Sequence, residues 1–181
     1  MLYMFLADGF EETEAIATLD VIKRAGLKIK TVGIGKKNVT GSHAITVVAD
    51  ITSDEAVKDG LKGVVLPGGM PGTLNLQKSS FVEDMIDYCA KESLLIAAIC
   101  AAPMILGEMG ILNGKNATCY PGFENHFCGG RYTGDYVTVC ENIITGKGAG
   151  AAMLFGAKIA DYFDPGIGRK MLAEMQHVCI D

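Results

Sequence analysis

The sequence has little positive charge, and that charge collects nowhere. Its 181 residues include 16 lysines and arginines against 21 acidic residues, and the formal net charge is -5 at pH 7. Proteins that bind nucleic acid or an anionic membrane surface usually gather lysine and arginine on one face or in one block. No such block occurs here. We therefore expect no nucleic acid and no membrane among the partners.

Long apolar runs are also missing. A membrane-spanning helix needs about 20 consecutive apolar residues, and no segment approaches that length. Residues 1–7 read directly as a buried strand, without the basic start and apolar stretch of a signal peptide. The sequence thus predicts a cytoplasmic protein.

The cysteines and histidines lack the spacings that mark disulfide frameworks and metal sites. No Cys-x-x-Cys pair occurs, which favours reduced thiols. The histidines have no ligand spacing, so we expect no bound metal and surface positions for all of them. The six cysteines are Cys89, Cys100, Cys119, Cys128, Cys140 and Cys179, and the three histidines are His43, His126 and His177.

What the chain does contain is a regular alternation of short apolar runs and helical patterns. This alternation is typical of βαβ units and predicts a mostly parallel sheet in a single α/β domain over residues 1–181. The expected strands cover residues 2–7, 28–34, 44–49, 63–66, 94–99, 117–119, 136–140 and 143–145. The expected helices cover residues 11–25, 53–57, 80–91, 103–110, 151–163 and a last segment up to 177, with a turn over residues 38–42 and a capping box from Ser80 and Glu83.

The segment around Cys100 has the layout of a nucleophile elbow. Residues 94–99 form an uninterrupted apolar run, and Pro103 suits the first turn of a following helix. Cys100 would then lie at a strand-to-helix junction, where the positive end of the helix dipole favours the thiolate. A buried structural cysteine is the alternative that this segment alone leaves open, because free cysteines are among the most buried residues.

Two other unusual segments follow strands of the expected sheet. Residues 8–14 come after the first strand, and the Pro-Gly-Gly-Met-Pro-Gly segment of residues 67–72 follows the strand at 63–66. Ligands of parallel sheets bind beyond the carboxyl ends of the strands, so we expect both segments to meet Cys100 there. The backbone N–H groups of Gly69 and Ala101 are then candidates for holding an oxyanion. A tight strand-to-helix turn is the alternative for the glycines.

Glu14 is the carboxyl expected beside this cysteine. It shares with Thr18 and Val21 a row that borders the core-facing stripe of its helix. Protonated, it would donate a hydrogen bond to the thiolate, lower the pKa of the cysteine and shuttle a substrate proton; ionised, it would oppose thiolate formation. A solvent-exposed acid in the first helical turn is the alternative, and we expect it for Glu11 and Glu12.

The Gly-Ala-Gly segment of residues 148–150 precedes the last long helix. It matches neither a P-loop nor a complete dinucleotide fingerprint, so no cofactor is predicted. We interpret these glycines as a place of close helix packing.

Together these motifs resemble the DJ-1/ThiJ/PfpI superfamily, on its DJ-1-like branch. The resemblance covers essentially the whole chain, and it implies a flavodoxin-like three-layer sandwich and a homodimer. It also implies Cys100 as the reactive cysteine, Glu14 as the protonated glutamate beside it, and Gly69 and Ala101 as backbone donors. The motifs that carry it are Glu11-Glu12-Thr13-Glu14, Pro67-Gly68-Gly69, Ala97-Ala98-Ile99-Cys100-Ala101-Ala102-Pro103 and Gly148-Ala149-Gly150.

The resemblance implies two functions that use the same residues. The first is a glyoxalase III or deglycase activity without a cofactor, in which Cys100 adds to a small reactive 2-oxoaldehyde such as methylglyoxal, Glu14 moves the proton, and lactate is released. The second is a stress-protective redox sensor and chaperone whose Cys100 is oxidised to a sulfinate. A thiazole monophosphate biosynthesis label also accompanies the superfamily, but no phosphate or thiazole site is evident.

Tyr120 departs from the family pattern. Many members have a histidine at this position, just before Pro121. A phenol is a poor general base at neutral pH, although it can donate a hydrogen bond. The tyrosine therefore weakens any mechanism that needs a Cys-His pair, including that of a PfpI-type protease.

Overall fold

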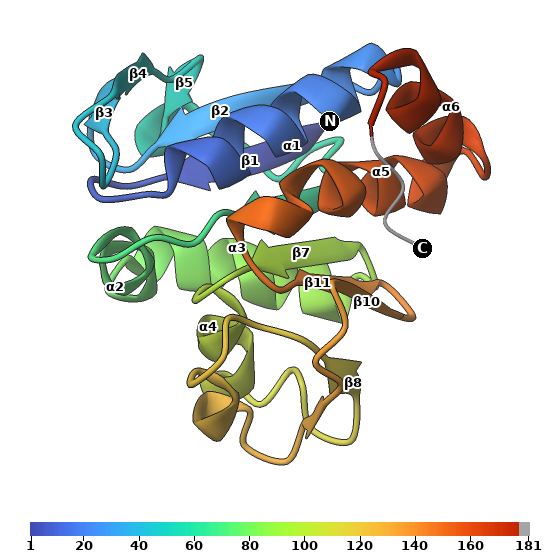
Figure 1. Cartoon of the computed structure of the whole chain (residues 1–181). Helices are drawn as coiled ribbons and strands as arrows, with labels where there is room; N and C mark the ends of the chain where they lie inside the picture. The colour runs from blue at the N-terminus through green and yellow to red at the C-terminus, as the bar shows by residue number, and fades with distance from the viewer. Residues whose placement is uncertain (178–181) are drawn as a thin grey trace.

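A seven-stranded sheet forms the centre of the structure, a computed structural model that describes residues 1–177 (Figure 1). Its strand order is β10-β11-β7-β6-β1-β2-β5, and all neighbours are parallel except β10 and β11. The strands are β1 (Leu2–Leu6), β2 (Ile29–Gly33), β5 (Ile51–Thr52), β6 (Gly63–Leu66), β7 (Leu95–Ile99), β10 (Val137–Cys140) and β11 (Ile143–Gly146). The predicted mostly parallel sheet is confirmed.

Helices cover both faces of this sheet. One face carries α1 (Glu12–Arg24) and α5 (Ala152–Phe163), with α6 (Ile167–Glu174) packed outside them. The other face carries α3 (Ser80–Lys91), next to α2 (Gly72–Gln77) and α4 (Pro103–Glu108). These layers form the expected three-layer sandwich.

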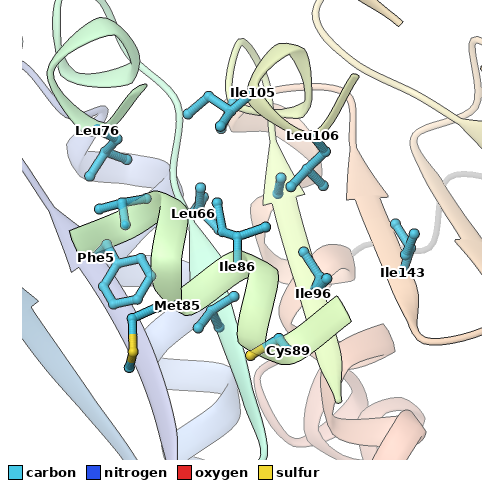
Figure 2. Packing of buried hydrophobic residues seen from close by; sticks show 14 of the residues in the cluster. Phe5, Leu66, Leu76, Met85, Ile86, Cys89, Ile96, Ile105, Leu106 and Ile143 are labelled. Atoms are coloured by element: carbon cyan, nitrogen blue, oxygen red, sulfur yellow. The ribbon is translucent and has the colours of Figure 1, made fainter. Parts of the chain in front are cut away.

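The buried strands explain why their sequences are apolar without alternation. Every residue of β1, β6 and β7 is buried, because helices cover both sides of the sheet. Figure 2 shows Phe5, Leu66 and Ile96 from the strands packing against Met85 and Ile86 of α3. Each fully buried side chain of this size contributes about 1.5–3 kcal/mol to folding, so the sheet that holds the strand ends in place is firmly anchored.

The prediction of a turn over residues 38–42 is wrong. Residues 38–40 form β3 (Asn38–Thr40), which pairs in antiparallel fashion with β4 (Thr46–Val48) as a separate hairpin. The polar residues of β3 suit an exposed strand as well as a turn, and the sequence pattern does not separate the two.

Other short elements also differ from prediction. Residues 53–55 form a single 3₁₀ turn (Ser53–Glu55) instead of a helix to 57, and Ser79, not Ser80, caps α3 by accepting from the Val82 N–H. The strand expected at residues 117–119 is present as β8 (Asn116–Ala117), whereas the helix α2 and the partner strand of β8, which is β9 (Arg131–Tyr132), were not expected. Two further 3₁₀ turns cover Glu124–His126 and Ala149–Ala151. Elements this short do not display a period in the sequence.

The topology brings the three special segments to one edge of the sheet. The chain moves from β1 to β2 on one side, and then crosses to β6 on the other side of β1. This reversal places a crevice at the carboxyl ends of β1 and β6. Residues 8–14 follow β1, residues 67–72 follow β6, and Cys100 follows β7.

Three further expectations can be compared with residues 1–177: those on membrane-spanning helices, on the cysteines and on the last helix. No helix within residues 1–177 combines the length and apolarity needed to cross a bilayer. The five cysteines in this range are free thiols, and Cys179 lies outside the described residues. The last helix ends at Glu174, short of the predicted position 177.

Candidate active site

Cys100 occupies a strained elbow directly after β7. Its φ is +64°, a left-handed conformation that costs a non-glycine residue about 1–2 kcal/mol. Two backbone hydrogen bonds hold it there: the Cys100 N–H donates to Gly146 O at 2.9 Å, and the Cys100 carbonyl accepts from the Tyr120 N–H at 2.9 Å. The elbow expected from the sequence is therefore present, and two segments later in the chain fix its geometry.

Glu14 reaches the same place from the first turn of α1. Only 1% of its surface is exposed, because α1 packs against one face of the sheet and its first turn meets the segments that carry Gly68 and Cys100. Its Oε2 accepts the Gly68 N–H at 2.8 Å. Its Oε1 is buried without a hydrogen-bond partner, and the Cys100 thiol lies close enough to shift the pKa of the carboxyl. The alternative of a solvated Glu14 is excluded.

Gly68 is the residue that lets this glutamate and the cysteine meet. A Cβ placed on Gly68 would lie 2.6 Å from the Cys100 Cβ and 2.8 Å from Glu14 Oε2. The two side chains thus flank one glycine at van der Waals distance, and no other amino acid fits between them.

Burial raises the pKa of Glu14 to about 7. Hydrogen bonding with Cys100 and with the Gly68 N–H acts in the opposite direction, while the charge of Glu11 raises the pKa further. A carboxyl with this pKa is present in both protonation states at neutral pH. That is the property required of a group that accepts and then returns a proton.

Burial also raises the pKa of the Cys100 thiol, to about 12, with further raising contributions from the charge of Glu14 and the hydrogen bond to it. The backbone N–H groups of Gly69 and Ala101 donate towards the sulfur and lower the pKa, but by less. The expectation that the helix dipole shifts Cys100 towards the thiolate is not met, because burial outweighs it and raises the pKa. Helix α4 begins only at Pro103 and is a short one. The thiol needs a base to take its proton, and Glu14 is adjacent.

The glycine loop is shaped by contact with the end of β1. Gly69 has a φ of +90°, and a Cβ on it would lie 2.3 Å from the Glu11 nitrogen. The Glu11 N–H donates to Gly68 O at 2.8 Å, and the Gly72 N–H donates to Gly9 O at 3.1 Å. These contacts fix the direction of the Gly69 N–H, so the loop is more than a tight turn.

Tyr120 is connected to the site through its backbone. Its N–H bonds the Cys100 carbonyl, whereas its side chain is 53% exposed and lies edge-on to Phe123, with ring centroids 6.5 Å apart. The phenol thus forms a wall beside the cysteine, and its role as a hydrogen-bond donor to substrate stays a prediction.

The expectation of a solvated Glu12 is wrong. Only 6% of its surface is exposed, and its carboxylate accepts the N–H groups of His43 at 2.8 Å and Ile45 at 3.3 Å. Burial alone would raise its pKa, but hydrogen bonds from the His43 ring and from backbone N–H groups lower it to about 2. No sequence signal predicts this contact, because the partner segment is the turn of a hairpin about thirty residues away in the chain.

The same contact forms the group of metal-ligating atoms found among residues 1–177. Atoms of Glu11, Glu12 and His43 lie within 4.8 Å of one another. The Glu12 carboxylate is already occupied by backbone N–H groups and by His43 Nδ1 at 2.9 Å. We therefore interpret the group as an ion pair that ties the β3–β4 hairpin to the start of α1.

The interpretation of residues 148–150 as close helix packing is wrong. A Cβ on Gly150 would meet no atom within 4 Å, and one on Gly148 would approach only the Tyr120 ring, at 3.4 Å. These residues line a surface depression of about 300 Å³ together with Tyr120, Pro121 and Tyr136. The glycines open a surface beside Cys100 rather than a helix contact.

Comparison with known proteins decides the family. The model of the DJ-1/PfpI family matches residues 1–162. The chain belongs to the DJ-1/PfpI family. A family relative, the protein dj-1beta of Drosophila melanogaster, is 37% identical over 161 residues, which are 87% of this chain and 86% of that protein.

Solved structures of the DJ-1/PfpI family share the fold. The crystal structure of Drosophila melanogaster DJ-1beta superposes with a TM-score of 0.92 at 32% identity, covering 98% of each chain. Oxidized Toxoplasma gondii DJ-1 superposes with a TM-score of 0.93 at 27% identity, again over 98% of each chain. The flavodoxin-like architecture predicted from the sequence is thus confirmed.

One relative in the DJ-1/PfpI family has a name that states an activity. The glutathione-independent glyoxalase DJR-1.2 of Caenorhabditis elegans is 30% identical over 162 residues, which are 88% of this chain and 86% of that protein.

Proposed function

We propose that this protein is a glyoxalase that converts small 2-oxoaldehydes such as methylglyoxal into 2-hydroxy acids, without a cofactor. The observation that carries the proposal is the buried Glu14 carboxyl, with a pKa of about 7, against the Cys100 thiol. The glyoxalase relative in Caenorhabditis elegans supports the same reaction class. A deglycase activity would use the same cysteine on aldehyde adducts of amines or thiols.

In the first step Glu14 activates the thiol. Its carboxylate takes the Cys100 proton as the sulfur adds to the aldehyde carbon, and the C=O π bond breaks to leave an alkoxide. The N–H groups of Gly69 and Ala101, which face the sulfur, are placed to stabilise this oxyanion. The proton then passes from Glu14 to the alkoxide, and the product is a thiohemiacetal.

In the second step Glu14 transfers a proton between two carbons. Its carboxylate removes the proton from the former aldehyde carbon to give an enediolate and returns it to the neighbouring carbon. The hydroxyl proton passes from the first oxygen to the second, and the product is a thioester of Cys100. Water then cleaves the S–C bond, which releases lactate and restores the thiol. Methylglyoxal and one water thus become one lactic acid, and no outside oxidant or reductant takes part.

The decisive experiment measures lactate formed from methylglyoxal by reduced protein. We expect turnover by the wild type, none by Cys100→Ala, and a loss of about 10²–10⁴-fold in Glu14→Gln. The exposed Cys128 provides the matched control, since Cys128→Ser removes a thiol that is not part of the elbow. Turnover that survives in Cys100→Ala, or its absence from the wild type, would refute the proposal.

The alternative role as a redox sensor uses the same residues. A sulfinate on Cys100 would be held by Glu14 and by the N–H groups of Gly69 and Ala101. Oxidation proceeds through the thiolate, however, and burial keeps the pKa of Cys100 at about 12. We therefore rank it second. If methylglyoxal is not turned over, formation of a Cys100 sulfinate in a peroxide titration followed by mass spectrometry would support the redox-sensor role.

A further inference from the structure

The depression beside Cys100 has features that the glyoxalase mechanism does not use. We call it the Lys147 depression; it is lined by Tyr120, Pro121, Tyr136 and residues 147–151 and encloses about 300 Å³. The Tyr120 and Tyr136 rings are both more than half exposed, so they border an open surface rather than the core.

Both walls of the depression are attached to the reactive cysteine. Tyr120 donates its N–H to the Cys100 carbonyl, and Lys147 directly follows Gly146, which accepts the Cys100 N–H. The backbone of Cys100 is therefore hydrogen-bonded to Tyr120, which lines the depression, and to Gly146, which precedes Lys147.

Lys147 gives this surface a positive charge held in place. Its Nζ donates to Gly134 O at 2.9 Å and lies 5.9 Å from the centre of the Tyr136 ring. No carboxylate among residues 1–177 forms an ion pair with it. An ammonium has three donors, so two remain after the bond to Gly134. The ammonium is fixed, half-buried and available to an anion.

We propose that Lys147 binds an acidic group of the substrate, so that the protein prefers 2-oxoaldehydes that carry a carboxylate over neutral ones. The identity of the reacting group rests on the proposed glyoxalase function, whereas the anion site rests on the Lys147 depression alone. The carbon chain between the two groups would lie along the Tyr120 ring, with the aldehyde at Cys100 and the carboxylate at Lys147.

The first test compares 4,5-dioxopentanoate, which would give 2-hydroxyglutarate, with methylglyoxal. We expect Lys147→Met to lower kcat/KM for the carboxylate substrate by about two- to fivefold, the size of one partly exposed charge pair. It should leave kcat/KM for methylglyoxal unchanged, and Lys147→Arg should retain the preference. Lys158→Met, which removes an exposed lysine of α5, is the matched control. Equal losses on both substrates, or no loss on either, would overturn the proposal.

The second test does not depend on turnover. Iodoacetate and iodoacetamide alkylate the same thiol, with an S–C bond formed, iodide released and the thiol proton lost to solvent, but only iodoacetate is an anion. Mass spectrometry at one pH follows alkylation of Cys100 by each reagent. We expect the rate with iodoacetate divided by the rate with iodoacetamide to fall about two- to fivefold in Lys147→Met and to stay constant in Lys158→Met.

The two tests separate the inference from the proposed function. A fall in the alkylation ratio without turnover of either aldehyde would retain the anion site and refute the glyoxalase. Turnover with an unchanged ratio and unchanged substrate preference in Lys147→Met would retain the glyoxalase and refute the anion site.

Discussion

At the scale of the residue, burial raises the pKa of both Glu14 and Cys100, and the consequences for the two groups differ. It raises the pKa of the carboxyl to about 7, and so provides a base at neutral pH. The same environment raises the pKa of Cys100 to about 12, and so keeps the sulfur protonated until that base acts. In the proposed mechanism the reactive unit is therefore the pair rather than the cysteine alone.

The pH dependence of turnover reports this pair. Because Glu14 must be ionised to take the thiol proton, we expect kcat/KM for methylglyoxal to fall as the pH drops below about 7. The charge of Glu11 raises the pKa of Glu14, so Glu11→Gln should move the midpoint to lower pH. A midpoint that is the same in both proteins would show that another group controls the profile.

Glu14 also makes stability depend on pH. Its pKa is about 7 in the folded protein against 4.5 as the reference value. A raised pKa means that the folded state binds the proton more tightly, so this contribution is complete below pH 4.5 and is lost as the pH rises to about 7. The loss amounts to about 3 kcal/mol.

Urea unfolding of the wild type and Glu14→Gln between pH 4.5 and 8 measures this loss. We expect the wild type to become less stable relative to the variant as the pH rises through this window. A constant difference would mean that the pKa of Glu14 is not raised.

At the scale of the element, α1 is the reason that a carboxyl lies beside the cysteine. It packs against the sheet and, on the same face, against α5, which covers Thr18 and Val21. Gly156 of α5 permits the approach, since a Cβ there would lie 3.0 Å from the Val21 Cβ. The position of α1, which carries Glu14, thus depends on a helix late in the chain.

The glycine loop after β6 sets the separation of the two reacting groups. A methyl group at Gly68 would press on Cys100 and Glu14 together. We expect Gly68→Ala to reduce methylglyoxal turnover by at least about 10²-fold, as misplacement of reacting groups by about 1 Å does.

Gly114→Ala is the contrasting variant for Gly68→Ala. Gly114 has a φ of +74° with open space around it, so an alanine there should cost about 1 kcal/mol of stability and leave turnover intact. Equal activity of Gly68→Ala and the wild type would contradict the tight geometry described for the site.

At the scale of the whole molecule, the family resemblance predicts a homodimer. Sedimentation equilibrium should then give twice the chain mass of 19.2 kDa. Ile45 and Val48 of the hairpin are large apolar residues that are more than half exposed. A mass of one chain over the concentration range of the activity assays would contradict the prediction.

The fold could be predicted because its signals are local and repeated. Buried strands such as residues 94–99 read as apolar runs, and the glycine loop and Cys100 follow such runs directly. The Glu12–His43 contact and the Lys147 depression could not be predicted, because each joins segments that are distant in sequence. The pKa of Cys100 was predicted in the wrong direction because it depends on the extent of burial, which the sequence does not show.

The hydrogen bond from the Cys100 N–H to Gly146 O has a consequence for the synthesis of the chain on the ribosome. Strand β11 enters the sheet beside β7, although more than forty residues separate them in the chain. Chains emerge from the ribosome from the N-terminus, so a nascent chain exposes the thiol of Cys100 before the partner of its backbone N–H has been made. Cys100 is therefore first made as an open thiol, and the strained elbow can be completed only after Gly146 has been translated.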